Sequence, residues 1–318
     1  MRYLEHRHRD WRAYTSGDAM SYEEVEFRAI DGTTLKGRLF EANQPGPAVV
    51  MCTGFNSVMD MLFLPETAGD LQASNITALL FDPRNTGASS GAPRNEIDPM
   101  KQIEDMSDAL TFLSCQRTAD STRLGFWGFS LGGTVALCAA SLDKRAKFVV
   151  AVNPLTDLEF EHGKQEKVLA TAIKDRESQS RGNSPFALQM VNEHGENPVG
   201  FGHGADKEKY SKIVQAGQPL GKNHVNEVTL QSYYKMVMWQ PFSLWRWIGP
   251  TKVLWITGAM DRMSYFEAQK EYFEGLQTEK QHHVEEGAGH EDILADRRRT
   301  KAVERMVGFI VMSTQRGD

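Results

Sequence analysis

Short apolar runs alternate with helical patterns along most of this chain, and this alternation constrains its fold more than any other feature. Six runs rich in β-forming residues lie at residues 48–53, 78–82, 124–128, 148–152, 252–257 and 282–285. Helical patterns, including those at residues 100–117 and 131–142, fall between them. Strands that alternate with helices form a parallel sheet with helices on both faces. The sequence therefore predicts an α/β fold with a mostly parallel central sheet flanked by helices.

The segment before the first of these runs has a different pattern. Residues 22–30 alternate between polar and apolar side chains, Asp31 and Gly32 form a typical turn pair, and residues 33–40 continue as a second strand-like run. Two such runs joined by a turn pair predict an antiparallel hairpin. Residues 1–20 are polar and charged, and we expect them to form an N-terminal tail.

The alternation of strands and helices stops between residues 155 and 250. This segment begins with a polar helical pattern and continues with glycine-rich sequence. A structureless loop of this length is rare in a compact domain, so an inserted cap explains the segment better. We therefore expect a core built from residues 21–154 and 251–318, with residues 155–250 inserted as a cap or lid.

The charge of the chain gives no indication of a nucleic-acid partner. The formal net charge is −6, and the one dense basic run, Arg297 to Arg299 with Lys301, falls within a helical pattern. A solvated helix face explains such a run.

No apolar stretch reaches the roughly 18 to 20 residues of a membrane span, and the charged start of the chain lacks the apolar centre of a signal peptide. We expect neither a nucleic-acid partner nor a membrane span.

The cysteines and the absence of metal and nucleotide motifs bear on the compartment and the cofactors of this protein. Cys52, Cys115 and Cys138 lie in apolar segments, which is typical of buried free thiols in a reducing compartment. We therefore expect a cytoplasmic protein without a disulfide framework. The chain has no H-E-x-x-H, no pair of C-x-x-C motifs, no P-loop and no G-x-G-x-x-G after the first strand, so we predict no metal and no cofactor.

A serine among glycines stands where an apolar run meets a helical pattern, in the sequence GFWGFSLGG at residues 125–133. Glycine weakens strands and helices, so these glycines imply a sharp turn or a close backbone approach. Gly128 to Gly132 match G-x-S-x-G between a strand and a helix, which is the setting of a nucleophile elbow. We predict Ser130 as a catalytic nucleophile. A packing turn that happens to contain serine is the alternative.

A serine nucleophile needs a base, and the base needs an acid that orients it. On the fold that carries this elbow they follow in the order Ser, Asp or Glu, His. Of the nine histidines, His290 alone lies in a glycine-rich loop between a strand and a helix. Asp261 follows the preceding strand and is the predicted acid. Asp157, just past the strand at residues 148–152, can reach the same edge of the sheet and stays an alternative.

Two backbone N–H groups are predicted to form the oxyanion hole. One follows the nucleophile, at Leu131, and the other comes from the loop after the first parallel strand, where Phe55 is the candidate. Thr53 precedes Gly54 at a place where many hydrolases of this fold carry histidine, so the hydrogen bonds within this loop must differ. The Asn56 side chain is either a further donor or an ordinary loop amide.

The predicted cap ends in an aromatic cluster. Trp239, Phe242, Trp245 and Trp247 lie within nine positions. Packing between cap and core, an apolar substrate wall and contact with a membrane surface each explain such a cluster. The first two explanations are compatible, and we predict Trp239 and Phe242 as substrate-binding residues.

The serine elbow, the loop FDPRNTGASSG at residues 81–91, Asp261 and His290 together resemble the α/β-hydrolase superfamily over nearly the whole chain after the tail. More narrowly, residues 54–113 and 126–155 resemble the fungal polyketide transferase and thiohydrolase family. Members of that family act beside polyketide synthases in secondary metabolism. They take an acyl chain from a carrier-protein thioester and pass it to water or to an alcohol.

The resemblance implies a serine hydrolase that forms an acyl-enzyme and releases a polyketide acyl group from a carrier-protein thioester. An acyltransferase to an alcohol and a hydrolase of a small ester or lactone are alternatives. A non-catalytic ligand binder is a third, but a binder has no need of a triad spread over three loops. A carrier domain is commonly acidic, so docking it would require a basic patch. The arginines near the C-terminus, or Arg2, Arg7, Arg9 and Arg12 in the tail, would supply one.

Overall fold

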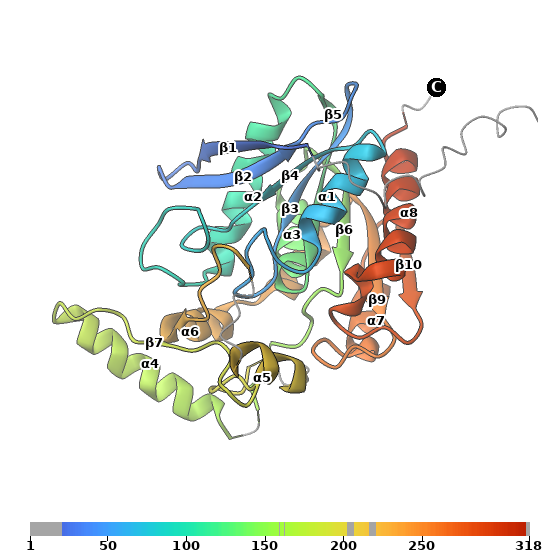
Figure 1. The fold of residues 1–318 in the computed structure, drawn as a ribbon. Coiled ribbons are helices and arrows are strands. Elements are labelled where there is room, and N and C mark those ends of the chain that lie inside the picture. Colours follow the sequence, from blue (N-terminus) through green and yellow to red (C-terminus); the bar gives the residue numbers. More distant parts are fainter. Residues whose placement is uncertain (1–20, 159, 162, 202–206, 216–220, 316–318) are drawn as a thin grey trace, which may run out of the picture.

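A computed structural model describes residues 21–158, 160–161, 163–201, 207–215 and 221–315 (Figure 1). The predicted N-terminal tail, with its four arginines, lies outside the described residues. The described residues form an α/β fold in which a large sheet lies between layers of helices. The predicted fold class is therefore confirmed.

Eight strands of the described residues form this sheet, in the order β1-β2-β4-β3-β5-β6-β9-β10. Their bounds are β1 (Glu23–Arg28), β2 (Thr34–Phe40), β3 (Gly46–Cys52), β4 (Thr77–Phe81), β5 (Ala119–Phe129), β6 (Ala146–Val152), β9 (Lys252–Gly258) and β10 (Lys280–Glu285). Strands β1 and β2 pair antiparallel, as do β2 and β4, and the other pairs are parallel. Both the N-terminal hairpin and the mostly parallel sheet are as predicted.

The helices that flank the sheet are α1 (Leu64–Ala73), α2 (Pro99–Ser114), α3 (Leu131–Leu142), α7 (Phe266–Gly275) and α8 (Asp296–Ser313). Helix α2 begins at Pro99, whose missing N–H costs nothing at that position, and the Asp98 carboxylate accepts a hydrogen bond from the Lys101 N–H at 3.3 Å. Helix α3 has the predicted bounds and begins immediately after Ser130. The end of β5 and the start of α3 therefore meet at this serine.

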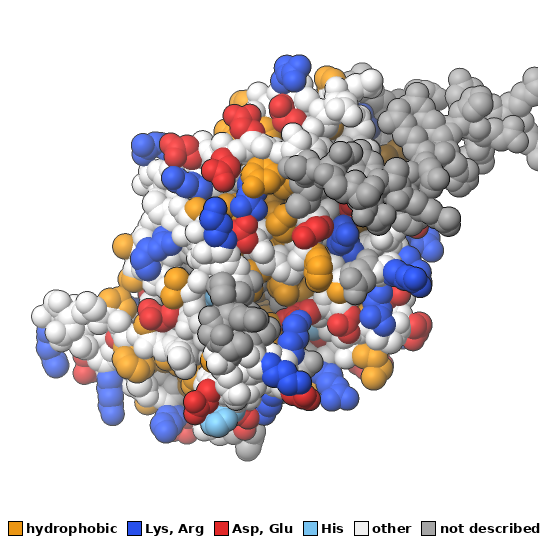
Figure 2. Space-filling model, in the orientation of Figure 1, with side chains coloured by type: hydrophobic (Ala, Val, Ile, Leu, Met, Phe, Trp, Pro, Cys, Tyr) orange, Lys and Arg blue, Asp and Glu red, His pale blue; other side chains and the backbone are white. Residues whose placement is uncertain are grey.

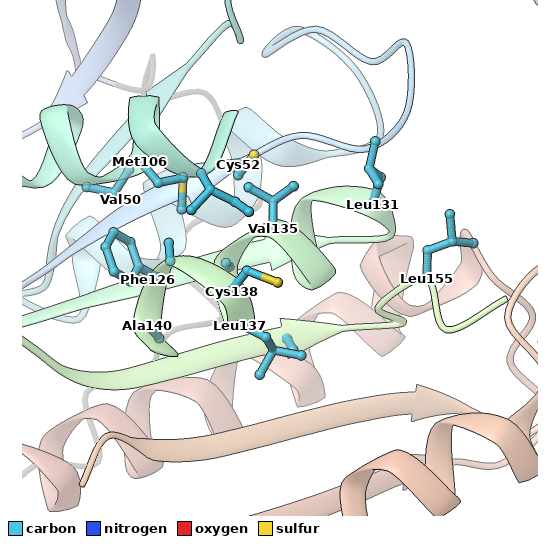
Figure 3. Close-up of a cluster of buried hydrophobic side chains, with 14 of the residues drawn as sticks. Val50, Cys52, Met106, Phe126, Leu131, Val135, Leu137, Cys138, Ala140 and Leu155 are labelled. Atoms are coloured by element: carbon cyan, nitrogen blue, oxygen red, sulfur yellow. The ribbon is translucent and has the colours of Figure 1, made fainter. Parts of the chain in front are cut away.

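Alternate side chains along the central strands pack into two separate cores. Val50 and Phe126 belong to the core under α2 and α3, and Figure 3 shows them beside Met106 of α2. Val49 and Trp127, their neighbours in sequence, belong to the core under α1 and α8. Successive strand side chains point to opposite faces, and both faces of this sheet are covered. This burial on both sides explains why the strands have continuous apolar runs.

The segment between β6 and β9 contains the elements of the predicted cap. They are α4 (Gln165–Ser180), β7 (Ala187–Leu188), α5 (Lys207–Gln215), β8 (Val228–Thr229), α6 (Leu230–Met238) and the 3-10 helix η2 (Pro241–Trp247). In Figure 1, α4, α5 and α6 lie beyond the end of the sheet toward which the β6 arrow points. The inserted helices therefore stand over the carboxyl ends of the parallel strands. The division of core from cap at residues 155 and 250 stays a prediction.

The three cysteines differ in burial. Cys52 and Cys138 are buried free thiols, and removal from water raises the pKa of each to about 12. Cys115 is exposed, because α2 ends there and leaves this side chain at the surface. The expectation of three buried thiols is therefore wrong for Cys115.

Figure 2 shows Lys and Arg side chains intermingled with Asp and Glu side chains over one face of the molecule. Such mixing is in keeping with a formal net charge of only −6 on 318 residues. In the part of the chain that the structure describes, every helix is too short or too polar to cross a membrane.

Candidate active site

The candidate site lies where the order of strands reverses, at β3. The chain places β4 on one side of β3 and β5 on the other. In open α/β sheets, ligands bind outside the carboxyl ends of the strands at such a point. Cys52 of β3 pairs with Gly128 of β5, so the loop that starts at Thr53 lies beside the turn at Ser130.

Ser130 has a backbone conformation that few residues other than glycine adopt, with a φ of 55° and a ψ of −126°. Close contacts explain the glycines around it. A Cβ atom at Gly128 would lie 2.0 Å from the carbonyl oxygen of Gly132, and one at Gly132 would lie 2.3 Å from the carbonyl oxygen of Thr53. These glycines let strand, turn and helix approach closely, and the tight turn places the serine at the end of the strand.

The structure brings Ser130, His290 and Asp261 into one hydrogen-bonded chain. His290 Nε2 lies 2.9 Å from Ser130 Oγ, and His290 Nδ1 lies 2.8 Å from Asp261 Oδ2. An ionised carboxylate can only accept, so Nδ1–H donates to Asp261 and Nε2 is left to accept the serine hydroxyl. The side chain of Asp261 is fully buried and that of His290 is 7% exposed. His290 thus donates this hydrogen bond to the predicted acid, Asp261, and not to Asp157.

The Asp261 carboxylate is held by several donors. Its Oδ1 accepts hydrogen bonds from the backbone N–H groups of Met263 and Ser264, each at 2.9 Å. Its Oδ2 accepts one from Gln269 Nε2 at 3.2 Å, besides the bond with His290. A buried charge requires such partners, and together they restrict how the carboxylate can rotate.

Asn153, which was not predicted as a site residue, connects the loop of the acid to the loop of the base. It follows β6 and is fully buried, with a φ of 42° that asparagine tolerates better than most residues. Its Oδ1 accepts a hydrogen bond from the Gly258 N–H at 2.8 Å, and its Nδ2 donates to the His290 carbonyl oxygen at 2.6 Å. Its position in the sequence, directly after a buried strand and before a proline, could have indicated this role.

The two amides predicted for the oxyanion hole are Phe55 N–H and Leu131 N–H. Leu131 is the first residue of α3, where the helix end favours negative charge. Among the described residues, neither N–H group has a hydrogen-bond acceptor. A Cβ at Gly54, the residue before Phe55, would lie 3.3 Å from the Cβ of Ser130. Two unpartnered donors therefore stand next to the serine.

Side chains of its own residues hold the loop after β3. Thr53 Oγ1 donates a hydrogen bond to the Ser57 carbonyl oxygen at 3.0 Å and closes the loop. Asn56 Nδ2 donates to the Val225 carbonyl oxygen at 3.4 Å and lies 3.4 Å from His224 Nε2. The Asn56 side chain thus contacts the inserted segment, which favours the explanation of an ordinary loop amide.

The sequence matches a family model described as the alpha/beta hydrolase fold over residues 47–296. The chain belongs to this family.

Several proteins are similar to this hydrolase over most of its length. It is 46% identical over 273 residues to a thiohydrolase from Eupenicillium brefeldianum, covering 86% of this chain and 88% of the relative. It is 38% identical to polyketide transferase ATR5 from Stachybotrys chlorohalonatus, covering 92% of this chain and 97% of the relative. A solved structure of DcsB with its substrate analogue has a TM-score of 0.85 at 38% identity, covering 92% of this chain and all of that one. These relatives are enzymes, and so is this hydrolase.

The pocket at Ser130 in the hydrolase is narrow and mainly apolar. Its volume is about 80 Å³, and Phe55, Met61, Leu155, Phe201, Met263 and the triad residues Ser130 and His290 are among the residues that line it. Asn197, Tyr210 and Glu291 supply polar atoms. In the described residues of the hydrolase, no group of three His, Cys, Asp or Glu side chains is placed to hold a metal ion.

The structure places the two predicted substrate-binding aromatics away from this pocket. Trp239 and Phe242 line a separate cavity of about 550 Å³ beside α7. The Phe242 ring stacks on Tyr272 of α7, with centroids 4.2 Å apart, so this side chain joins the inserted segment to the core. Neither residue lines the Ser130 pocket and the stack favours the packing explanation, while a role of Trp239 and Phe242 in substrate binding stays a prediction.

Other aromatic side chains stand next to the candidate nucleophile. The rings of Phe55 and Phe201 lie 4.9 Å apart and both line the Ser130 pocket of the hydrolase. Tyr233 of α6 supports both, at 5.7 Å from Phe55 and 5.9 Å from Phe201. Phe201 lies in a glycine-rich stretch without periodicity, so its sequence context carried no signal of this contact.

Glu291, next to the candidate base, connects the active-site loop to the inserted segment. Its carboxylate accepts a hydrogen bond from the Tyr210 hydroxyl and pairs with the Lys209 ammonium group, both on α5. Asp292 instead accepts a hydrogen bond from the Gly289 N–H at 2.8 Å. The amino-acid sequence alone indicated neither contact. Both help to fix the loop on which His290 stands.

Proposed function

We propose that this hydrolase releases a polyketide acyl group from a carrier-protein thioester through an acyl-enzyme on Ser130. The observation that carries the proposal is the hydrogen-bonded chain from Ser130 through His290 to Asp261 at the N-terminus of α3. The names of the relatives, thiohydrolase and polyketide transferase, support the substrate class.

In the first half of the proposed reaction, Ser130 Oγ attacks the thioester carbonyl carbon while His290 Nε2 takes the hydroxyl proton. The tetrahedral oxyanion accepts hydrogen bonds from the N–H groups of Phe55 and Leu131, which have no other acceptor among the described residues. Collapse of this intermediate breaks the carbon–sulfur bond, and His290 returns the proton to the leaving thiolate. The acyl group is then an ester of Ser130.

In the second half, the acceptor replaces the thiol. His290 takes a proton from water, and the resulting oxygen nucleophile attacks the acyl-serine ester. A second tetrahedral intermediate collapses, the proton passes to Ser130 Oγ, and the carboxylic acid leaves. Asp261 keeps the imidazole in the tautomer that both halves require and stabilises the imidazolium between them.

Transfer to an alcohol is the second candidate, and the apolar lining of the pocket favours it. Phe55, Met61 and Phe201 leave few polar atoms to hold a water molecule near Ser130. A site that excludes water lets a bound alcohol compete for the acyl-enzyme. Whether water or an alcohol accepts the acyl group therefore depends on how much water reaches Ser130 beneath the cap.

Docking of a carrier domain is a further part of the proposal. Among the basic residues near the C-terminus, Arg299 pairs with Asp70 and Arg298 donates to the Gly287 carbonyl oxygen at 3.0 Å. Arg297 is exposed and is the better candidate for a docking contact. Charge reversal there or at the arginines of the tail should slow turnover of a carrier-bound thioester and spare a free thioester. Equal effects on both substrates would remove this part of the proposal.

Intact-mass measurement tests the proposed function. The wild type and Ser130→Ala are incubated with a panel of acyl thioesters, with and without alcohols. We expect a transient acyl adduct on the wild type alone, with free acid as the product of a hydrolase or ester as the product of a transferase. If the wild type shows no adduct, no turnover and no labelling by a fluorophosphonate, the binding-protein alternative replaces the proposal.

A further inference from the structure

We propose that Gln269 is a positioning residue of the active site: it holds the Asp261 carboxylate in the orientation that aligns His290 with Ser130. The inference rests on the proposed function, because it concerns the same triad. Gln269 lies on α7, is fully buried and is absent from the lining of the Ser130 pocket. It therefore acts on the reacting groups through Asp261 and does not touch the substrate.

The side-chain amide of Gln269 makes four hydrogen bonds. Its Nε2 donates to Asp261 Oδ2 at 3.2 Å and to the Ser264 carbonyl oxygen at 2.6 Å. Its Oε1 accepts from Trp255 Nε1 and from Thr257 Oγ1, each at 3.0 Å. Every hydrogen-bonding position of the amide is thus used, which is what a buried amide requires.

These partners also fix which way the amide faces. The indole N–H of Trp255 can only donate and the carbonyl oxygen of Ser264 can only accept, so Oε1 must face the indole and Nε2 must face Asp261. Thr257 has a single hydroxyl proton, which goes to Oε1, and its oxygen lies 2.9 Å from His282 Nε2. That nitrogen therefore carries a proton and donates to Thr257. Burial lowers the pKa of His282, in keeping with a neutral ring.

The two oxygens of Asp261 are held from different sides. Backbone N–H groups hold Oδ1, whereas Oδ2 has two side-chain donors, His290 and Gln269. Without the amide of Gln269, His290 is the one side-chain donor left on Oδ2. The carboxylate can then rotate while Oδ1 stays in place, and the imidazole of His290 rotates with it. A displacement of about 1 Å at reacting groups can cost roughly a hundredfold in rate.

The test compares Gln269→Leu with a matched variant, Gln231→Leu. Gln231 is 4% exposed, and its Nε2 also donates to an aspartate and a backbone carbonyl oxygen, Asp175 Oδ2 at 2.6 Å and Ala172 at 2.9 Å, but in the inserted segment. We expect Gln269→Leu to lower kcat roughly 10- to 100-fold with KM unchanged within about twofold. Gln231→Leu should keep kcat within about twofold although it also loses thermal stability. Thermal melts measure the stability of both.

Gln269→Glu supplies a readout that a structural role would not produce. A protonated carboxyl group can donate to Asp261 as the amide does, whereas an ionised one cannot donate and repels Asp261. Burial and the neighbouring Asp261 charge raise the pKa of such a carboxyl group. For this variant we expect kcat/KM to fall as pH rises, with a limb that is absent from the wild-type profile. Melts at each pH show that the protein stays folded.

The outcomes separate this inference from the proposed function. If Ser130→Ala turns over thioester as fast as the wild type, the proposed function fails and the inference with it. If Ser130→Ala is inactive but Gln269→Leu keeps the wild-type kcat, the inference alone is overturned. A pH profile of Gln269→Glu that parallels the wild type also overturns it, and this arm applies even if Gln269→Leu does not fold.

Discussion

At the scale of single residues, three side chains from three separate loops meet in one hydrogen-bonded chain. When groups act as a unit, the losses of activity caused by substituting each of them do not add. Ser130→Ala and His290→Ala should each lower kcat/KM for an acyl thioester by roughly a thousandfold or more. The double variant should be little worse, since a base without a nucleophile has nothing to activate. Steady-state kinetics of the three variants provide the measurement, and losses that multiply would contradict a single unit.

Asp157 provides a control for the predicted acid, Asp261. Asp261→Asn should lose roughly as much activity as removal of the base, because the amide favours the wrong tautomer of His290. Asp157 lines the separate cavity beside α7, so Asp157→Asn should stay within about threefold of the wild type. If Asp157→Asn proves the more damaging of the two, Asp261 is not the acid.

The glycine after the nucleophile turn should be intolerant of a side chain. A Cβ at Gly132 would lie 2.3 Å from the Thr53 carbonyl oxygen, so Gly132→Ala must push β3 and α3 apart. We expect it to lower the free energy of unfolding by about 3 kcal/mol or more. Gly308→Ala in α8 meets nothing within 4 Å and should raise it by about 0.5 to 1 kcal/mol through helix propensity. Urea unfolding compares the two, and equal effects would refute the explanation by close contact.

At the scale of elements, Arg84 connects three parts of the core. Its guanidinium group pairs with Asp105 of α2, at 2.5 and 2.9 Å, and with Asp31 in the turn of the N-terminal hairpin, at 2.6 Å. The Asp105 side chain is fully buried. Breaking a buried pair leaves a charge without a partner, which costs far more than breaking a pair in solvent.

Arg84→Met should therefore lower the free energy of unfolding by about 3 to 5 kcal/mol. Lys101→Met removes a pair with Glu104 that is nearly half exposed on both sides, and it should cost less than about 1 kcal/mol. Chemical denaturation of the two variants is the comparison. A small effect of Arg84→Met would mean that water reaches Asp105 readily.

Element types were more predictable than contacts between elements. The helix after Ser130 has its predicted bounds because apolar periodicity and the preceding glycine turn both mark its start. Strand β5 begins at Ala119, five residues before the predicted start. The prediction missed this part because residues 120–123 are polar and at least partly exposed. The aromatic residues of η2 were recognisable as a cluster, but their partner Tyr272 lies on α7, far along the chain. Sequence patterns report periodicity and not which distant helix supplies the contact.

At the scale of the whole molecule, two partly buried histidines should make stability depend on pH. Burial lowers the pKa of His224, and burial together with nearby positive charge lowers that of His282, below the usual value of 6.5. As pH falls through 6.5, the unfolded chain binds protons that the folded protein does not, so folded stability declines. Above that pH both rings are neutral in either state, and their effect vanishes.

Urea unfolding between pH 7.5 and 5 checks this expectation. The wild type should lose stability as pH falls, and a double variant, His224→Gln with His282→Gln, should lose less over the same range. Identical slopes for the two proteins would show that other groups set the acid limit.

The amino-acid sequence by itself determined the fold class and the order of the candidate triad. Alternating apolar runs and helices specify a covered parallel sheet, and the carboxyl ends of parallel strands meet at one edge, so residues just after those strands had to come together. Only the tertiary structure decided what surrounds them. Phe201, Asn153 and Gln269 reach the site through the packing of loops and of α7, and hydrogen bonds between side chains distant in sequence leave no local pattern in a single chain. The same limit explains why Trp239 and Phe242, conspicuous in the sequence, lie in another cavity.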